Sequence, residues 1–349
     1  MSRRLVDKNI DKIKHECYQM VTKEVDLIQA HITEDDETLL KDTDFCHTFE
    51  INITECNTFK ESILDDLENS IKKYHTHNIL SLNNGIISYE RGYQKMYYKR
   101  VNSGRLVGIG GVFDAINYQT FPKALREVIY KGQYEYDICN SAPTLLSQYF
   151  NKKVNKPLLN LEKYINDKDY YRNILVKRGF TYNQAKQYLL AMTFGSKMDI
   201  DSDMYYENKD WAKETGVELV RNAVEDIEIM ELYLDVQEMF NTLGALIKEK
   251  SKKEKGKYYI YNKVNKCKVL NKWDTSKAVM HKYFGLESFI LDILKDTFEC
   301  NLLLYDAIIT KEDLDTEELS TFIFMESDYK VQFEKIKIGA KSETQEIKV

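Results

Sequence analysis

Residues 134–150 read YEYDICNSAPTLLSQYF, and this pattern predicts a short strand, a polar turn and a helix. Tyrosine and isoleucine alternate through Tyr134–Ile138 as they do in strands, Asn140 is a typical N-cap residue, and Pro143 suits a first helical turn. Asp137 therefore stands at a strand end facing a helix N-terminus, where a metal-bound phosphate can be held. An ordinary cap or turn aspartate is the alternative from this stretch alone.

The composition is that of an ordinary globular protein. The 349 residues are 43% hydrophobic and 30% charged, enough for a substantial core. The net charge of -6 gives no global basic field of the kind that marks many nucleic-acid-binding proteins. No apolar run reaches the ~20 residues of a membrane span, and the first residues lack the apolar segment of a signal peptide. We expect an intracellular, cytoplasmic protein with no membrane partner.

The cysteines predict free thiols. They are scattered without any CxxC pair, and Cys46-His47 with Cys56 is a poor zinc candidate because no second close pair follows. Free thiols fit a reducing compartment. The six are Cys17, Cys46, Cys56, Cys139, Cys267 and Cys300.

A helix is predicted in residues 180–197, FTYNQAKQYLLAMTFGSK. Thr181 and Gln184 form a capping box, and Gly195 ends the helix. Core packing would account for the apolar members of one helical face but not for the lysine in its middle. The side chains of that face fall four residues apart, at Tyr182, Lys186, Leu190 and Phe194.

A second acid interrupts an apolar segment near the C-terminal end of the chain. Residues 302–310, LLLYDAIIT, predict a strand that contains Asp306. A carboxylate there is costly unless it is paired, hydrogen-bonded or bound to a metal. Leu286–Phe298 predicts an amphipathic helix before it, and residues 315–327 and 331–339 predict a helix and a final strand after it.

Positive charge is concentrated in residues 246–273, which hold ten lysines and two glutamates. Residues 258–261 and 266–271 could form the strands of a basic hairpin, while a solvated, mobile loop is the alternative. Farther upstream, four glycines lie between residues 104 and 111. They fit neither GxGxxG before a helix nor a phosphate-binding loop, so nucleotide-binding folds of those kinds are not supported.

Several short motifs in order resemble family A polymerases and the single-subunit phage RNA polymerases. SGRL (103–106), NYQTFP (117–122) and Arg126 are similar to the family's TGRL, NLQxIP and arginine run. The strand-end acid Asp137 is similar to motif A, and KQYLLAMTFGSK (186–197) to motif B of the phage enzymes. FGLESFILDIL and LYDAI are similar to the helix and turn of motif C. The resemblance covers roughly residues 100–310.

The resemblance implies an α+β right-hand polymerase, with an antiparallel palm sheet, helical fingers and a helical, thumb-like N-terminal part. The expected parts are a thumb-like region (1–92), palm with motif A (93–150), fingers (151–284) holding the basic hairpin (246–273), palm with motif C (285–339) and a polar tail (340–349).

The resemblance also implies roles for single residues. Asp137 and Asp306 would hold two Mg²⁺ ions, or Mn²⁺ in their place, helped by the Ile138 carbonyl. Lys186, assisted by Arg178, would contact the phosphates of the incoming nucleotide, although Tyr182 replaces the family's usual arginine before the lysine. Phe194 would lie under the sugar and the templating base. Contacts with nucleic acid are expected from Arg105, Gln119, Arg126, Lys257 and Tyr305, the last of which replaces the usual histidine.

Sugar choice rests on two positions that disagree. Ala142 stands where family A DNA polymerases carry a glutamate that excludes a 2′-hydroxyl, and its methyl group leaves ribonucleotides sterically allowed. Phe194 stands where the RNA polymerases carry a tyrosine whose hydroxyl helps to select ribose. We therefore expect weak sugar discrimination.

The leading functional hypothesis is a template-directed DNA polymerase without a proofreading exonuclease, of viral, phage or mobile-element origin. An RNA polymerase or primase on the same fold is the second hypothesis, and an inactive nucleic-acid-binding scaffold is the third. Template-independent tailing also stays open. The expected partners are a DNA primer–template or an RNA/DNA hybrid, a dNTP or NTP, and a helicase or other replication protein.

Overall fold

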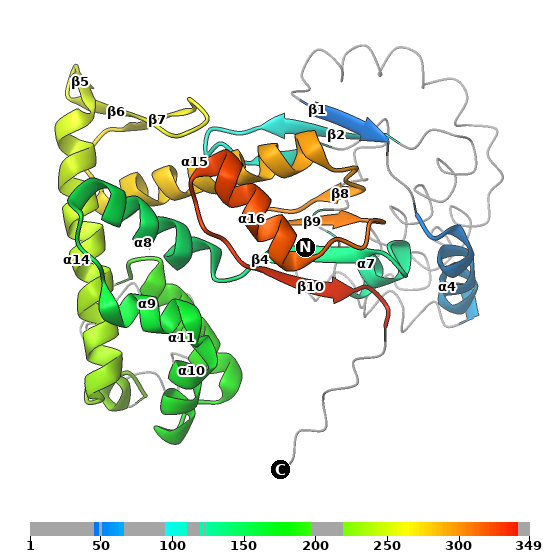
Figure 1. Ribbon diagram of the computed structural model, residues 1–349, viewed down its shortest axis with the longest axis horizontal. Coiled ribbons are helices and arrows are strands. Elements are labelled where there is room, and N and C mark those ends of the chain that lie inside the picture. The colour runs from blue at the N-terminus through cyan, green and yellow to red at the C-terminus, as the bar shows by residue number, and fades with distance from the viewer. Residues whose placement is uncertain are drawn as a thin grey trace, which may run out of the picture.

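Helices and three antiparallel sheets make up the part of the chain that the computed structural model describes (Figure 1). The described residues are 45–48, 51–65, 95–109, 119, 121, 123–196 and 219–340. This architecture confirms the α+β class. The predicted turn at Asn84-Gly85, most of the thumb-like region, the loop at 110–118 and the tail after residue 340 lie outside the described residues.

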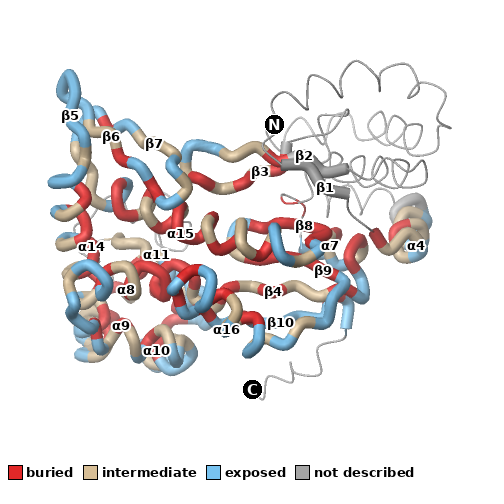
Figure 2. Tube along the Cα trace, turned by 45° about the horizontal axis from the view of Figure 1, so that its top comes forward, coloured by how far each residue is buried: buried red, intermediate tan, exposed pale blue. Residues whose placement is uncertain are grey.

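The sheet that carries both acidic motifs has the strand order β10-β4-β9-β8. Its register places Asp137 opposite Ala307 on one side and opposite Glu334 on the other. The helices α15 and α16 pack against this sheet, and its buried residues form much of the core (Figure 2). The elements are β4 (Tyr134–Ile138), β8 (Leu302–Leu303), β9 (Ala307–Thr310), β10 (Phe333–Lys337), α15 (Thr275–Thr297) and α16 (Thr316–Ser327).

The expected single strand across 302–310 is wrong, because the segment folds into two short strands joined by a turn. Leu304 N–H donates to the Ala307 carbonyl at 2.8 Å and closes this turn. Asp306 lies inside the turn rather than in a strand. Because Asp306 lies in the turn, its carboxylate is not fully buried between neighbouring strands. Full burial of an unpaired carboxylate would cost on the order of several kcal/mol.

The predicted strand, turn and helix around Asp137 are confirmed, but Asn140 does not cap the helix through its side chain. β4 runs into α8 (Ser141–Val154) through a turn in which Asn140 is the N-cap residue. Asn140 adopts a left-handed conformation and makes no side-chain cap hydrogen bond. Its amide instead donates to the Ile165 carbonyl at 3.1 Å, so it ties the turn to the next helix.

A group of helices extends from the sheet on the side of α8 (Figure 1). The predicted capping box of Thr181 and Gln184 is present on α11, and the helix ends as expected before Gly195, whose φ is +81°. The helix expected at Leu286–Phe298 begins earlier, at Thr275, so the expected boundary at 284/285 falls inside one continuous helix. The group comprises α9 (Leu159–Asn166), α10 (Lys168–Lys177), α11 (Tyr182–Thr193) and α14 (Ile227–Lys250).

The basic stretch is an ordered three-stranded sheet, not a loop. Its strands are β5 (Lys252–Glu254), β6 (Lys257–Tyr261) and β7 (Cys267–Leu270). Asn262 fastens the sheet to the body of the protein by donating to the Ser103 carbonyl at 2.7 Å. The same asparagine packs so closely on Gly285 that a Cβ there would lie 2.5 Å from its side chain.

A further sheet combines β1 (Phe45–Thr48), β2 (Lys95–Arg100) and β3 (Leu106–Ile109), and β1 was not anticipated in a region expected to be mainly helical. The helix α4 (Ile53–Asp65) packs against α7 (Lys123–Ile129). Cys56, Cys139, Cys267 and Cys300 are free thiols, as expected. None of the described helices has both the length and the apolar character needed to cross a bilayer.

Gly195 should be intolerant of a side chain because it is both left-handed and crowded. A Cβ there would meet the Phe240 ring at 2.5 Å, whereas Gly256, with a φ of +77°, has nothing within 4 Å. We expect Gly195→Ala to lower the free energy of unfolding by ~2–4 kcal/mol, the sum of left-handed strain and overpacking. Gly256→Ala is the matched control and should lose only ~1 kcal/mol from strain. Equal losses in urea unfolding would contradict this account of the packing.

Candidate active site

Two acids from distant parts of the sequence meet at the end of the central sheet. Asp137 is the penultimate residue of β4, and Asp306 lies in the turn between β8 and β9. The Ile138 N–H donates to the Asp306 carbonyl at 3.0 Å, which holds the two backbones together. The structure thus brings together the pair that the sequence predicted.

The electrostatics of this pair favour a cation. Burial, followed by the charge of Asp306, raises the pKa of Asp137 to about 7. One carboxylate oxygen of Asp137, Oδ1, is buried without a hydrogen-bond partner. Burial also raises the pKa of Asp306, although the Arg105 guanidinium opposes that rise. An orphaned carboxylate oxygen beside a second carboxylate is a setting that a divalent cation would stabilise.

The residues present fit a magnesium ion that shares its ligands with a substrate. In the described part of the chain, no group of three or more histidine, cysteine or acidic side chains forms a metal cluster. Mg²⁺ commonly uses one or two carboxylates and completes its shell with water and substrate phosphates. Asp137 and Asp306 meet that requirement. The part expected of the Ile138 carbonyl stays a prediction.

Three more charged residues surround Asp137 and were not predicted. Glu334 faces it across the β10 pair, Glu135 precedes it on β4, and both raise its pKa. Lys168 lowers that pKa and lies 3.8 Å from Glu334. The sequence predicted the strand that contains Glu334. Its position opposite Asp137 depends on the register between β10 and β4, which no local pattern gives.

Arg105 forms an internal ion pair instead of presenting a free guanidinium. Its Nε and a terminal nitrogen donate to the Glu287 carboxylate at 2.6 and 2.9 Å. Its guanidinium carbon lies 4.1 Å from the ring centre of Phe284 and 4.9 Å from that of Tyr305. Burial raises the pKa of Glu287 to about 7, and the Arg105 pair opposes the rise. The sequence did not predict the ion pair between Arg105 and Glu287. Contact of Arg105 and Tyr305 with nucleic acid stays a prediction.

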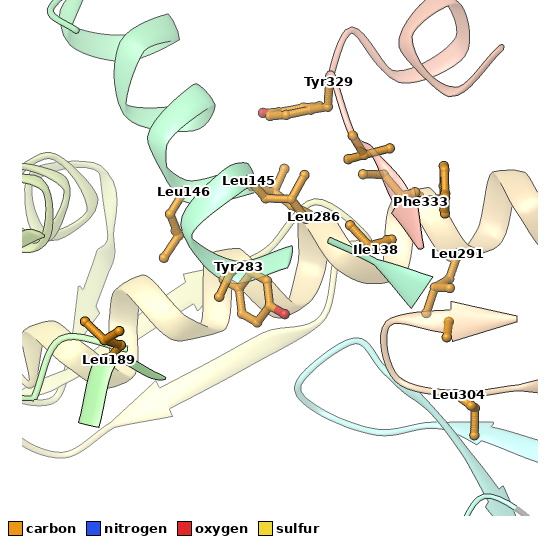
Figure 3. Close-up of a cluster of buried hydrophobic side chains, with 14 of the residues drawn as sticks. Ile138, Leu145, Leu146, Leu189, Tyr283, Leu286, Leu291, Leu304, Tyr329 and Phe333 are labelled. Atoms are coloured by element: carbon orange, nitrogen blue, oxygen red, sulfur yellow. The ribbon is translucent and has the colours of Figure 1, made fainter. Parts of the chain in front are cut away.

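The buried Tyr283 of α15 links the start of α8 to the end of α11. The Tyr283 hydroxyl donates to Glu287 and lies 3.2 Å from the Ser141 hydroxyl oxygen at the start of α8. The Phe194 ring packs edge-on against the Tyr283 ring, with the centres 6.0 Å apart. Figure 3 shows Tyr283 within the apolar cluster that α8 and α15 share. Ala142, which was expected to face the sugar, is only 3% exposed beside this network.

Most of the predicted face of α11 is open to solvent, and only Phe194 at its end packs against the core. Tyr182 is 47% exposed and Leu190 is 49% exposed, so the core-packing interpretation of Leu190 is wrong. Lys186 is exposed between them and, within the described residues, pairs with no carboxylate. The structure therefore leaves Lys186 available to a ligand and does not place it in contact with the two acids.

The other two expected phosphate contacts have partners inside the protein. Arg178 ends α10 and pairs with Asp226 at 3.0 Å. The Tyr182 hydroxyl donates to Asp169 at 2.8 Å and accepts from Arg172 at 2.9 Å. Arg172 thus places a guanidinium beside Tyr182. It was missed because it lies on the preceding helix.

The remaining predicted nucleic-acid contacts differ in how accessible they are. Gln119 is buried, and its amide bonds to the Gly108 N–H and to the Leu106 and Leu303 carbonyls at 2.7–3.0 Å. Those bonds give it a structural role between two sheets that the sequence did not suggest. Arg126 is half-buried with Nε unpartnered, and Lys257 is exposed at the start of β6.

Comparisons with known proteins assign no family to the chain. No protein-family model matches it. No curated protein matches it either. Among solved structures, it is similar to the POL domain of Pol1 from M. smegmatis in complex with DNA primer-template and dNTP, with a TM-score of 0.49 and 10% identity. The match covers 95% of this chain and 64% of that one.

Asp137 should make stability depend on pH in a direction opposite to that of an ordinary paired aspartate. Its folded pKa of about 7 exceeds the ordinary value of 3.8, so the folded state holds the proton more tightly. Stability should fall as pH rises from 4 to 7 and stay reduced above 7. We expect Asp137→Asn to raise the melting temperature at pH 8 and to change it little at pH 4, measured with a chelator present.

The exposed Asp296 provides the matched control for this measurement. Asp296→Asn should keep the pH profile of the unaltered chain. If Asp137→Asn also kept that profile, the Asp137 carboxylate would not have the raised pKa.

Proposed function

We propose that this chain is a template-directed nucleotidyltransferase of the family A polymerase type, which extends a primer with deoxynucleotides. The observation that carries the proposal is the Asp137–Asp306 pair, in which one carboxylate has a raised pKa and an orphaned oxygen. In this proposal the central sheet is the palm and α9, α10, α11 and α14 are the fingers. The ordered basic sheet β5–β7 supplies a positively charged surface for the template.

The chain's own residues would divide the work of the reaction. Asp137 and Asp306 would hold Mg²⁺, which when bound activates the primer hydroxyl and neutralises charge on the triphosphate. Lys186, exposed on α11, would take the triphosphate, with Arg172 behind Tyr182 as a second cation. Phe194, held by Tyr283, would form the wall beneath the sugar. Arg105 and Tyr305 would border the primer end on the side of Asp306.

Primer extension with Mg²⁺ tests this assignment. We expect Asp137→Asn and Asp306→Asn each to lower kcat by ~10³-fold or more, because each removes a charge that stabilises the transition state. Lys186→Ala should lower kcat/KM by ~10–100-fold, because it removes a charged group that binds phosphate. Lys177→Ala, at an exposed lysine on the neighbouring α10, is the matched control and should leave activity unchanged. Full activity in both acid variants would refute the proposal.

Sugar discrimination should be weak in the same assay. Neither Ala142 nor Phe194 carries a group that selects one sugar, so we expect rates with dNTP and NTP to differ by less than ~10³-fold, or ~4 kcal/mol. Phe194→Tyr restores a hydroxyl and should shift the ratio toward NTP. A preference above a thousandfold in the unaltered chain would contradict the expectation.

An RNA polymerase or primase is the second candidate, and Ala142 is the observation that favours it. Such an enzyme would start synthesis without a primer, whereas the leading proposal requires one. Omitting the primer from the assay therefore separates the two. Nucleic-acid binding that persists with no synthesis under any condition would instead indicate an inactive scaffold.

A further inference from the structure

A small basic cavity lies away from the acidic pair, where α8, α14 and α15 meet the strands β5 and β6. Its volume is about 180 Å³. It shares no lining residue with the candidate active site. Lys153, which borders it, is twelve residues along α8 from Ser141, or ~18 Å at 1.5 Å per residue. The cavity is therefore a separate feature of the molecule.

Four lysines from four elements converge on this cavity. They are Lys153 on α8, Lys250 on α14, Lys252 on β5 and Lys282 on α15. The described lining residues include no acid, although Lys252 pairs with Glu254 outside the cavity. Burial lowers the pKa of Lys282, and the charges of Lys153 and Lys250 lower it further. Mutual repulsion of this kind is relieved by a bound anion.

The rest of the lining suits a flat ring. Tyr149, Tyr259 and Tyr261 border the cavity, and Tyr261 is 54% exposed. Leu243 and Ile260 are buried apolar residues of the lining. Lys282 donates to the backbone carbonyl of Tyr261, which fixes its ammonium group at the strand β6. Aromatic stacking beside lysines is the combination by which proteins hold nucleotides without reading their sequence.

We propose that this cavity binds one nucleoside phosphate, with the lysines holding the phosphate and the tyrosines stacking on the base. The ligand is either a free nucleotide or one nucleotide of a single strand, since both offer the same chemistry. This site goes beyond the polymerase assignment, because it uses none of the residues assigned to the reaction, although Lys252, Tyr259 and Tyr261 belong to the basic sheet that the assignment gives to the template.

Binding to the full chain tests the proposal in an Asp137→Asn background with EDTA, which suppresses metal-dependent binding at the acidic pair. The variant is Lys153→Gln with Lys250→Gln, two exposed lysines without a carboxylate partner among the described residues. The matched control is Lys152→Gln. Lys152 is adjacent on α8 but pairs with Asp328 at 2.9 Å and lies over Tyr329, outside the cavity. Equal melting temperatures would show that every variant folds.

For a free nucleotide, we expect ATP to bind saturably, inorganic phosphate to compete, and the double variant to lose affinity at least tenfold. Tyr261→Ala should weaken ATP but not phosphate. For a strand, ATP should bind poorly, and the double variant should lower the salt slope of a deoxythymidine oligonucleotide by ~0.7, the value for the one phosphate that is no longer neutralised. If the double variant matches the control with both probes, the proposal is overturned. Primer extension with Asp137 intact is scored separately, so its failure would leave this result standing.

Discussion

One backbone hydrogen bond, from Ile138 to the Asp306 carbonyl, fixes two carboxylates side by side at the end of a sheet. The arrangement works against the stability of the free protein, because burial and like charge both oppose ionisation of Asp137. The surrounding fold must therefore hold β4 in place. It does so by pairing β4 with β9 on one side and β10 on the other, and by packing α15 and α16 on the sheet. The rest of the site is built outward from this constraint.

Features with a local physical cause were predictable from the sequence. The strand, turn and helix around Asp137 follow from strand propensity and from a proline in the first helical turn. The capping box of α11 and its end at Gly195 depend only on residues within a few positions of each other. In the site, the same local reasoning located both acids and the exposed Lys186.

Features that depend on pairing between distant segments were not predictable. Glu287, Tyr283 and Arg172 sit on ordinary helical faces, and nothing in their spacing shows that they meet Arg105, Ser141 and Tyr182. Gln119 was expected to face a ligand, but three backbone groups from two sheets saturate its amide. The turn at Asp306 was hidden by its apolar neighbours, since a run of such residues suits one long strand as well as two short ones.

Arg105 lies close to the acidic pair but does not neutralise Asp137. Arg105 is near enough to Asp306 to oppose the rise of that pKa, yet its Nε and one terminal nitrogen are committed to Glu287. Moving it toward Asp137 would strand a buried glutamate, which costs ~3–5 kcal/mol. Lys168, the other nearby cation, is shared with Glu334. Neither side chain bonds to Asp137 Oδ1, which has no hydrogen-bond partner. A proton satisfies this carboxylate below its pKa of about 7, and in the proposed function a bound cation would do so above it.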